Sequence, residues 1–344
     1  MRNIIYDQIS TKAQPGTEDK ITVLKKLEEV FPDDHKKIIS DSIDGNIIWH
    51  VEHIRESYVY DHEIDYNLLK KTFLTNNIIY YTGAEKNQTI IDIENKHGIK
   101  IKTKNPFEWE TCLALKHAED FIKNKTNHIN KKTYAPFNFI CYNRCVKLHR
   151  FLILANLKEQ NLLYNAIYSW HPDANRISDI KNQLININID RSFLNENQIC
   201  TYDEDKSISK NVKHPNLDIR ALYNFNHPLN SYFLVVTETF YNNTIFFTEK
   251  TYKAFLFLQP FVFIGNHNSL DYLRSQGYDL FDDIIDHSYD LEKNLFLRVK
   301  LASNEIKRLC DLDWPELLHK NLNRLIKNYK NVVLRSKKFK SNSF

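Results

Sequence analysis

The stretch that decides the fold is residues 231–290, which read SYFLVVTETFYNNTIFFTEKTYKAFLFLQPFVFIGNHNSLDYLRSQGYDLFDDIIDHSYD. The apolar run at 232–236 predicts a buried strand, and residues 248–257 carry apolar side chains at helical spacing. A second apolar run at 261–264, closed by Gly265, predicts another strand. This alternation of strand and helix is typical of an α/β domain.

Three ionisable residues lie at the junctions between these elements, namely Glu238, Glu249 and Lys250. Charged groups at strand-to-helix junctions of an α/β sheet are where nucleotides and phosphates are usually bound. Because neither GxGxxG nor GxxxxGK[ST] occurs in the chain, a glycine-rich phosphate loop is excluded. The pattern therefore favours a nucleotide-dependent enzyme.

Length and composition indicate a soluble protein of two domains. A chain of 344 residues is long for a single core, and 42% hydrophobic with 26% charged residues is typical of globular proteins. The formal net charge of +4 is too small to indicate nucleic-acid binding by itself. Cys141, Cys145 and His149 lack the second pair that a zinc site needs, so the five cysteines are expected to be reduced thiols.

Neither a signal peptide nor a membrane span is expected. The first ten residues contain no sustained apolar core, and no segment reaches the roughly 18 apolar residues that a spanning helix requires. We therefore expect a cytoplasmic protein, at most peripheral to a membrane. The abundance of Ile, Asn and Lys fits an AT-rich viral or bacterial genome.

The N-terminal part predicts a βαβ-type domain with a parallel sheet. Its predicted strands are residues 4–6, 38–40, 46–51 and 77–81, and its predicted helices are 18–31, 66–74 and 106–123. The polar, basic segment 124–134 has no periodicity and indicates a domain boundary. We assign residues 1–130 to an N-terminal α/β domain and residues 131–344 to a C-terminal α/β domain that ends in helices.

The C-terminal part opens on the strand PFNFICY. Its further predicted elements are helices at 146–159, 269–276, 291–309 and 315–329, a strand at 164–170 and a polar excursion over 171–228. Two Rossmann-like α/β domains that face each other across a cleft are the architecture consistent with this order.

The segment YNRCVKLHRFLILANL places Arg144, Lys147, His149 and Arg150 around the start of a helix. Cations at a helix N-terminus oppose the helix dipole, and a local cost of this kind tends to mark a functional site. Guanidinium groups there could bind a pyrophosphate together with the helix N–H groups. The alternative interpretation is a solvated basic first turn.

The segment FFTEKTYKAF provides Thr248 as an N-cap, Glu249 in the first turn and Lys250 within reach of a phosphate oxygen. Lys250 and Arg150 could neutralise the charge of a departing nucleoside diphosphate without a metal. Glu238, just beyond a strand, could accept hydrogen bonds from a sugar hydroxyl. The alternatives are an ordinary capped helix with a surface lysine, and a loop acid.

Taken in order, strand, Glu, loop, TEK, helix and PFVFIG resemble the donor-binding motif of the α-1,3-fucosyltransferase family. The preceding strand–Asn–Arg segment, with Arg144, resembles that family's upstream block. The resemblance implies that Arg150 is the donor-phosphate arginine, Glu238 the acid of the first motif half and Glu249–Lys250 the Glu–Lys pair. Phage and bacterial glycosyltransferase-like proteins are similar too. A GT-B architecture and an inverting transfer are implied, with no cofactor other than the nucleotide-sugar.

The chain departs from the family pattern in the donor motif. Thr239 stands where the family usually has Asn, and Phe255, Phe257 and Gln259 replace small residues of the helix. The donor pocket is therefore expected to have a different shape. A GDP-sugar is favoured as donor, with a fucose-like sugar among the candidates.

An inverting transfer needs a general base on the acceptor side. Glu85 follows the strand IIYYTG and resembles the strand–Glu element of the fucosyltransferases, so it is the first candidate. Glu52 in WHVEH is the second, and its neighbouring histidines do not form the HExxH zinc motif. The triplet at 203–205 (DED) is more simply a solvated acidic loop than a metal site, and no metal is expected.

The segment 320–340 carries eight basic residues and no acidic one. A docking helix with a solvated basic face is the expectation, with a membrane surface or nucleic acid as further candidate partners. The leading hypothesis is an inverting, metal-independent glycosyltransferase that acts on a glycan or another hydroxyl acceptor. The alternative is a non-catalytic protein on a glycosyltransferase-like scaffold that binds nucleic acid or a membrane surface.

Overall fold

The computed structural model describes residues 37–43, 46–53, 78–82, 91, 95, 100–103, 119–143, 146–170, 174–194, 199–200, 226–239, 241 and 245–341. The chain divides into two compact units. One comprises Met1–Pro106 with Asn243–Phe246, and the other comprises Phe107–Asn242 with Phe247–Phe344. Each unit contains one sheet. The predicted α/β class is therefore confirmed.

The first unit contains a four-stranded sheet in the order β1-β2-β3-β4. Its strands are β1 (Lys37–Ile43), β2 (Asn46–His53), β3 (Ile78–Thr82) and β4 (Lys100–Thr103). The three strands predicted at 38–40, 46–51 and 77–81 are confirmed, and β4 was not predicted. The sheet is mixed rather than wholly parallel, because β1 pairs with β2 in antiparallel register while the other pairs are parallel. The predicted elements at 4–6, 18–31 and 66–74 lie outside the described residues.

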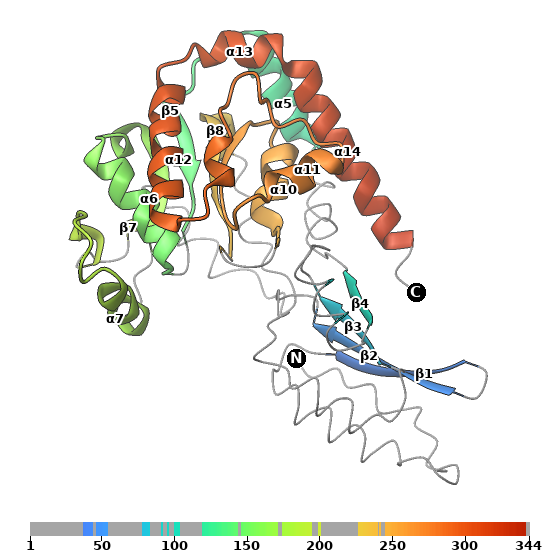
Figure 1. Cartoon of the computed structure of the whole chain (residues 1–344). Coiled ribbons are helices and arrows are strands. Elements are labelled where there is room, and N and C mark those ends of the chain that lie inside the picture. The colour runs from blue at the N-terminus through green and yellow to red at the C-terminus, as the bar shows by residue number, and fades with distance from the viewer. Residues whose placement is uncertain are drawn as a thin grey trace. The chain divides into compact units, whose positions relative to one another are not determined.

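The second unit contains a five-stranded sheet in the order β7-β6-β5-β8-β9 (Figure 1). Its strands are β5 (Phe137–Cys141), β6 (Ala166–Trp170), β7 (Ile199–Cys200), β8 (Ser231–Thr237) and β9 (Phe261–Ile264). Four of them are mutually parallel, and only the short edge strand β7 runs antiparallel. Parallel strands are buried on both faces, which explains the continuous apolar run of β8, in which every residue is buried.

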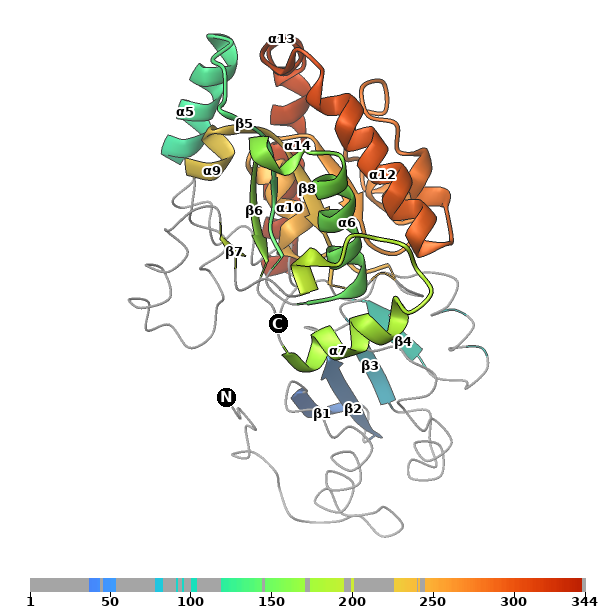
Figure 2. The same cartoon turned by 90° about the vertical axis from the view of Figure 1, so that its left-hand side faces the viewer.

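Two helices cover one face of this sheet, and others cover the opposite face. The helices are α5 (Glu119–Asn130), α6 (Leu148–Glu159), α7 (Ala174–Gln183), α9 (Asn226–Leu229), α10 (Glu249–Leu256), α11 (Leu270–Ser275), α12 (Leu295–Cys310), α13 (Trp314–Lys320) and α14 (Leu322–Ser341), with 3₁₀ turns η2 (Leu163–Asn165), η3 (Ser192–Leu194) and η5 (Ser288–Leu291). Figure 2 shows α6 and α12 together on one side of the strands, and α12 packs directly on α6.

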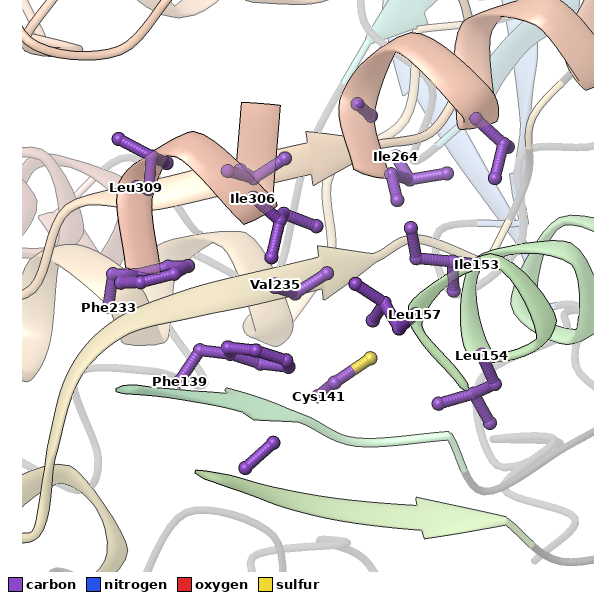
Figure 3. Packing of buried hydrophobic residues seen from close by; sticks show 14 of the residues in the cluster. Phe139, Cys141, Ile153, Leu154, Leu157, Phe233, Val235, Ile264, Ile306 and Leu309 are labelled. Carbon is purple, nitrogen blue, oxygen red and sulfur yellow. The ribbon is translucent and has the colours of Figure 1, made fainter. Parts of the chain in front are cut away.

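The core between the sheet and this helix pair is built from alternate strand residues. Figure 3 shows Phe139, Val235 and Ile264 of three strands directed at Leu157 of α6 and Ile306 of α12, all of them at most 3% exposed. Side chains that alternate across a strand leave the intervening residues for the other face. There Phe255 of α10 makes an edge contact with the ring of Phe261, at 5.4 Å between centroids.

The segment predicted as a linker, 124–134, is mostly helical, and this corrects the prediction. Helix α5 runs from Glu119 to Asn130 and packs on α13 in the second unit. Lys125, buried in α5, donates hydrogen bonds to the carbonyls of Pro228 and, at 3.0 Å, of Ser231. The units therefore divide at Pro106/Phe107 instead of at residue 130. Helix α7 likewise occupies the start of the predicted polar excursion.

The C-terminal basic segment forms two helices, α13 and α14, where one was predicted at 315–329. The apolar side of α14 is docked, with Leu325 and Val332 buried. Arg324 binds Asp279 and Asp283 at 2.7 and 2.8 Å, so part of the basic face is engaged within the protein. None of the helices in the described ranges is both long and apolar enough to span a bilayer.

Candidate functional site

The strand order of the second unit creates a topological switch point between β5 and β8. From β5 the chain passes through α6 to β6 on one side, whereas β8 pairs with β5 on the other side. In open α/β sheets, ligands bind outside the carboxyl ends of the strands at such a point. The residues that follow the two strands, Asn143 after β5 and Glu238 after β8, therefore define the place to look for a site.

A buried polar chain fixes three strand ends at this place. The backbone N–H of Asn143 donates to Oγ of Ser169 at 3.0 Å, and Oγ1 of Thr237 donates to Oδ1 of Asn143 at 2.7 Å. All three side chains are at most 3% exposed. Buried polar networks that are fully hydrogen-bonded rigidify their surroundings. The ends of β6, β5 and β8 are thus held in register by polar residues that sequence reasoning did not single out.

Glu238 holds the start of α10 against the end of β8. One carboxylate oxygen accepts from the N–H of Thr248 at 2.9 Å and the hydroxyl of Thr251 at 2.6 Å. The other accepts from the hydroxyl of Thr248 at 2.7 Å and the N–H of Thr239 at 3.1 Å. Glu238 is fully buried, and a carboxylate there complements the positive end of the helix dipole. Both carboxylate oxygens of Glu238, which was predicted to contact a sugar hydroxyl, therefore already accept hydrogen bonds from the protein.

Arg150 and His149 cap the backbone carbonyls at the end of β8. One Nη of Arg150 donates to the carbonyls of Thr237 and Glu238 at 3.3 and 3.2 Å, and Nε2 of His149 donates to that of Glu238 at 2.7 Å. Arg150 is only 3% exposed. Burial, assisted by the charge of Arg150, holds the pKa of His149 well below its usual value, so the imidazole is neutral. Arg150 thus supports the site from beneath, instead of presenting its guanidinium to a phosphate.

Two lysines from different helix starts meet on Thr239, the residue after Glu238. Lys147, the N-cap of α6, donates from Nζ to the carbonyl of Thr239 at 2.7 Å. Lys250, in the first turn of α10, reaches the Thr239 hydroxyl at 3.4 Å and that of Thr248 at 2.9 Å. The Lys250 side chain is 25% exposed and Lys147 is half-buried. Together they form a solvent-accessible cationic pair at the switch point, which we call the Thr239 lysine pair.

The charge around the Thr239 lysine pair remains positive. Oε1 of Glu249 lies 3.3 Å from Nζ of Lys250. Burial raises the pKa of Glu249, but Lys250 and Lys253 outweigh it and bring the pKa to about 2, so the carboxylate is ionised at neutral pH. The two carboxylates at this place, Glu238 and Glu249, are therefore outnumbered by four cations, Lys147, Arg150, Lys250 and Lys253. The excess of cations makes this surface suited to an anionic ligand.

Gly265, at the end of β9, allows the strand to pass close to Glu238. A Cβ atom on Gly265 would lie 2.5 Å from Cζ of Phe263 and 3.3 Å from Cβ of Glu238. The Phe263 ring is only 1% exposed, so it would have to shift within the core. Glycine is therefore required here by close approach.

Replacing Gly265 by alanine should lower the free energy of unfolding by roughly 1–3 kcal/mol, because overpacking displaces the Phe263 ring. Urea denaturation followed by tryptophan fluorescence measures this change. Ser275→Ala, at an exposed position on α11, is the control and should change stability by no more than about 0.5 kcal/mol. Equal stability of the two variants would show that the close approach is not tight.

Four of the six predicted site residues gather at the end of β8: Arg150, Glu238, Glu249 and Lys250. Arg144 and Glu85 lie outside the described residues, as does the acidic triplet at 203–205. Lys147, which the sequence placed in the same basic cluster, is half-buried, whereas Arg150, predicted to bind the donor phosphate, is buried. Within the described part of the chain, no three His, Cys, Asp or Glu side chains are grouped as metal ligands.

Comparison with known proteins gives no relative: no family model, no curated protein and no solved structure matches the chain. The site therefore has to be interpreted from its own geometry, and three facts matter. It lies at the switch point of a parallel sheet, it is positive, and its lysines come from two different helix starts. This combination can bind the phosphates of a nucleotide without a glycine-rich loop.

Proposed function

We propose that this protein is an inverting, metal-independent glycosyltransferase of the GT-B type, which moves a sugar from a nucleoside diphosphate sugar to an acceptor hydroxyl. The observation that carries the proposal is the Thr239 lysine pair, Lys147 and Lys250, at the switch point between β5 and β8. The order of the motifs along the chain, which resembles that of the α-1,3-fucosyltransferases, gives separate support.

The chemistry follows from where charge develops in a sugar transfer. As the bond from the sugar to the diphosphate breaks, negative charge accumulates on the leaving diphosphate. Two ammonium groups held on Thr239 can stabilise that charge, and they need no reorganisation because Glu238 and Arg150 already fix the end of β8. We include Glu85, on the first unit, as the base that removes the acceptor proton, and Arg144 as a further phosphate ligand.

A thermal-shift panel of GDP, UDP, CDP, ADP and TDP, each with and without Mg²⁺, tests the proposal. GDP should raise the melting temperature by roughly 5–10 °C at a hundredfold excess over its Kd, with or without Mg²⁺. The reason is that the lysine pair supplies the positive charge. A protein that none of the five nucleotides stabilises would not bind a donor of this kind, and a shift that requires Mg²⁺ would contradict the metal-independent part.

The alternative, a non-catalytic protein that binds nucleic acid or a membrane surface through its basic end, has less support. Arg324 is bound by two aspartates, and Arg335 donates to Oε1 of Gln276 at 2.5 Å. Both arginines therefore serve contacts within the protein. Steeply salt-dependent binding to DNA in the absence of any nucleotide-induced shift would favour this alternative over the transferase.

A further inference from the structure

A small cavity lies at the other end of the second unit's sheet, where β5 and β8 begin. It is lined by Lys125 and His128 of α5, by Lys132 in the turn after that helix, by Ser231 and Tyr232 of β8, and by Leu318 of α13, among others. Its volume is about 20 Å³. A cavity of this size holds roughly one water molecule or one monatomic ion. The transferase proposal makes no use of it.

The side chain of Lys125 brings a cation to this cavity without a counter-charge. It is 3% exposed, and its Nζ donates to two backbone carbonyls, those of Pro228 and Ser231. An ammonium group has three donors, so one remains. Among the described residues no carboxylate pairs with it, and burial alone lowers the pKa of Lys125 to about 7. Buried charges in proteins are normally paired, so this site lacks an anion.

Two further residues of the lining are basic, His128 and Lys132, and its other members are uncharged. His128 follows Lys125 at a spacing of three residues, which places both on one side of α5, and Lys132 lies in the turn after the helix. The imidazole of His128 has no partner among the described residues and is half-buried. Lys132, at an exposed position, forms an ion pair with Glu316. None of the described residues that line the cavity is acidic.

We propose that this cavity binds a small monovalent inorganic anion of chloride size, between the ammonium of Lys125 and the imidazole of His128. The anion supplies the counter-charge that the buried ammonium lacks. It also accepts a hydrogen bond from the third N–H of that ammonium, which the two carbonyls do not engage. The volume of about 20 Å³ suits a monatomic anion better than a phosphate or a carboxylate ligand. Because Lys125 joins α5 to the start of β8, an anion that favours the charged ammonium also strengthens this junction.

The test compares melting temperatures of the full chain in chloride and in gluconate at constant ionic strength. Chloride should raise the melting temperature by roughly 3–6 °C at a tenfold excess over its Kd, while gluconate, which is too large for the cavity, should not. Lys125→Met and His128→Ala should each abolish or strongly reduce the difference. Lys300→Met, on the exposed face of α12, should retain it in full.

An equal melting temperature of the wild-type protein in both salts would overturn the proposal, and so would a full chloride effect in His128→Ala. The second variant matters because Lys125→Met removes two hydrogen bonds and could fail to fold, whereas His128 makes no such contact. Bromide replaces chloride in a direct check: an anomalous peak between Lys125 and His128 in bromide-soaked crystals supports the site, and its absence contradicts it.

Discussion

Replacing Lys250 by alanine should reduce the rate of sugar transfer by about 10²–10³-fold, the usual effect of removing one group that stabilises transition-state charge. The ammonium of Lys250 is held by the hydroxyls of Thr239 and Thr248, at the solvent-facing end of β8. In the proposed transfer its charge acts most strongly when the diphosphate departs, so kcat is expected to fall more than the affinity for the donor. Hydrolysis of GDP-sugars and transfer to hydroxyl acceptors, measured by release of GDP, give both constants.

Lys147→Ala should lower activity in the same direction, since its ammonium contacts the same residue, Thr239, from α6. Lys300→Ala, an exposed lysine on α12, is the matched control and should keep full activity. The fold of each variant is checked by circular dichroism. A Lys250→Ala protein that transfers sugar at the wild-type rate would remove the lysine pair from the mechanism.

Replacing Glu238 by alanine should lower the free energy of unfolding by roughly 3–5 kcal/mol, which is typical when one partner of a buried charged network is removed. Four donors lose their acceptor: two backbone N–H groups, and the hydroxyls of Thr248 and Thr251. The positive end of the α10 dipole loses its carboxylate as well. Urea denaturation followed by circular dichroism measures the change.

Two further variants make the Glu238 result specific. Asp179→Asn, at an exposed position on α7, should alter stability by no more than about 0.5 kcal/mol. The free energy of unfolding of Glu238→Gln should lie between those of the wild-type protein and of Glu238→Ala. The glutamine amide keeps one acceptor oxygen but turns an NH₂ group toward the donors. If Glu238→Ala were as stable as the wild-type protein while losing donor binding, the carboxylate would serve a ligand and not the helix.

Much of the second unit could be predicted from the sequence, because burial on two faces leaves a clear pattern. Residues 232–236 of β8 and all of β9 are apolar, as expected for strands of a parallel sheet that are covered on both faces. The helix predicted at 106–123 covers the start of α5, and the rest of α5, beyond residue 123, was missed for an equally physical reason. Its buried stripe consists of Phe121, Lys125 and Ile129, so a lysine occupies a core position and conceals the helical period.

The site was predictable in position but not in the direction of its long side chains. Arg150 and Lys147 both lie at the start of α6, and either could have faced a phosphate. Packing decides between them: Ile153 and Leu154, three and four residues after Arg150 and on its side of the helix, are fully buried, so this side faces inward. The guanidinium then finds carbonyls instead of solvent, whereas the N-cap position leaves Lys147 half-buried. Tertiary packing decides how a helix is rotated about its own axis, and the local sequence does not show it.

The contact between α10 and α14 has a consequence for biosynthesis. Proteins leave the ribosome from the N-terminus, and a helix cannot be covered by a segment that has not yet been translated. Helix α10 ends at Leu256 and α14 begins only at Leu322, so the nascent chain must display one flank of α10 during that interval. Helix α10 therefore acquires its final surroundings late, and a chaperone that shields this flank would protect the nascent protein from aggregation.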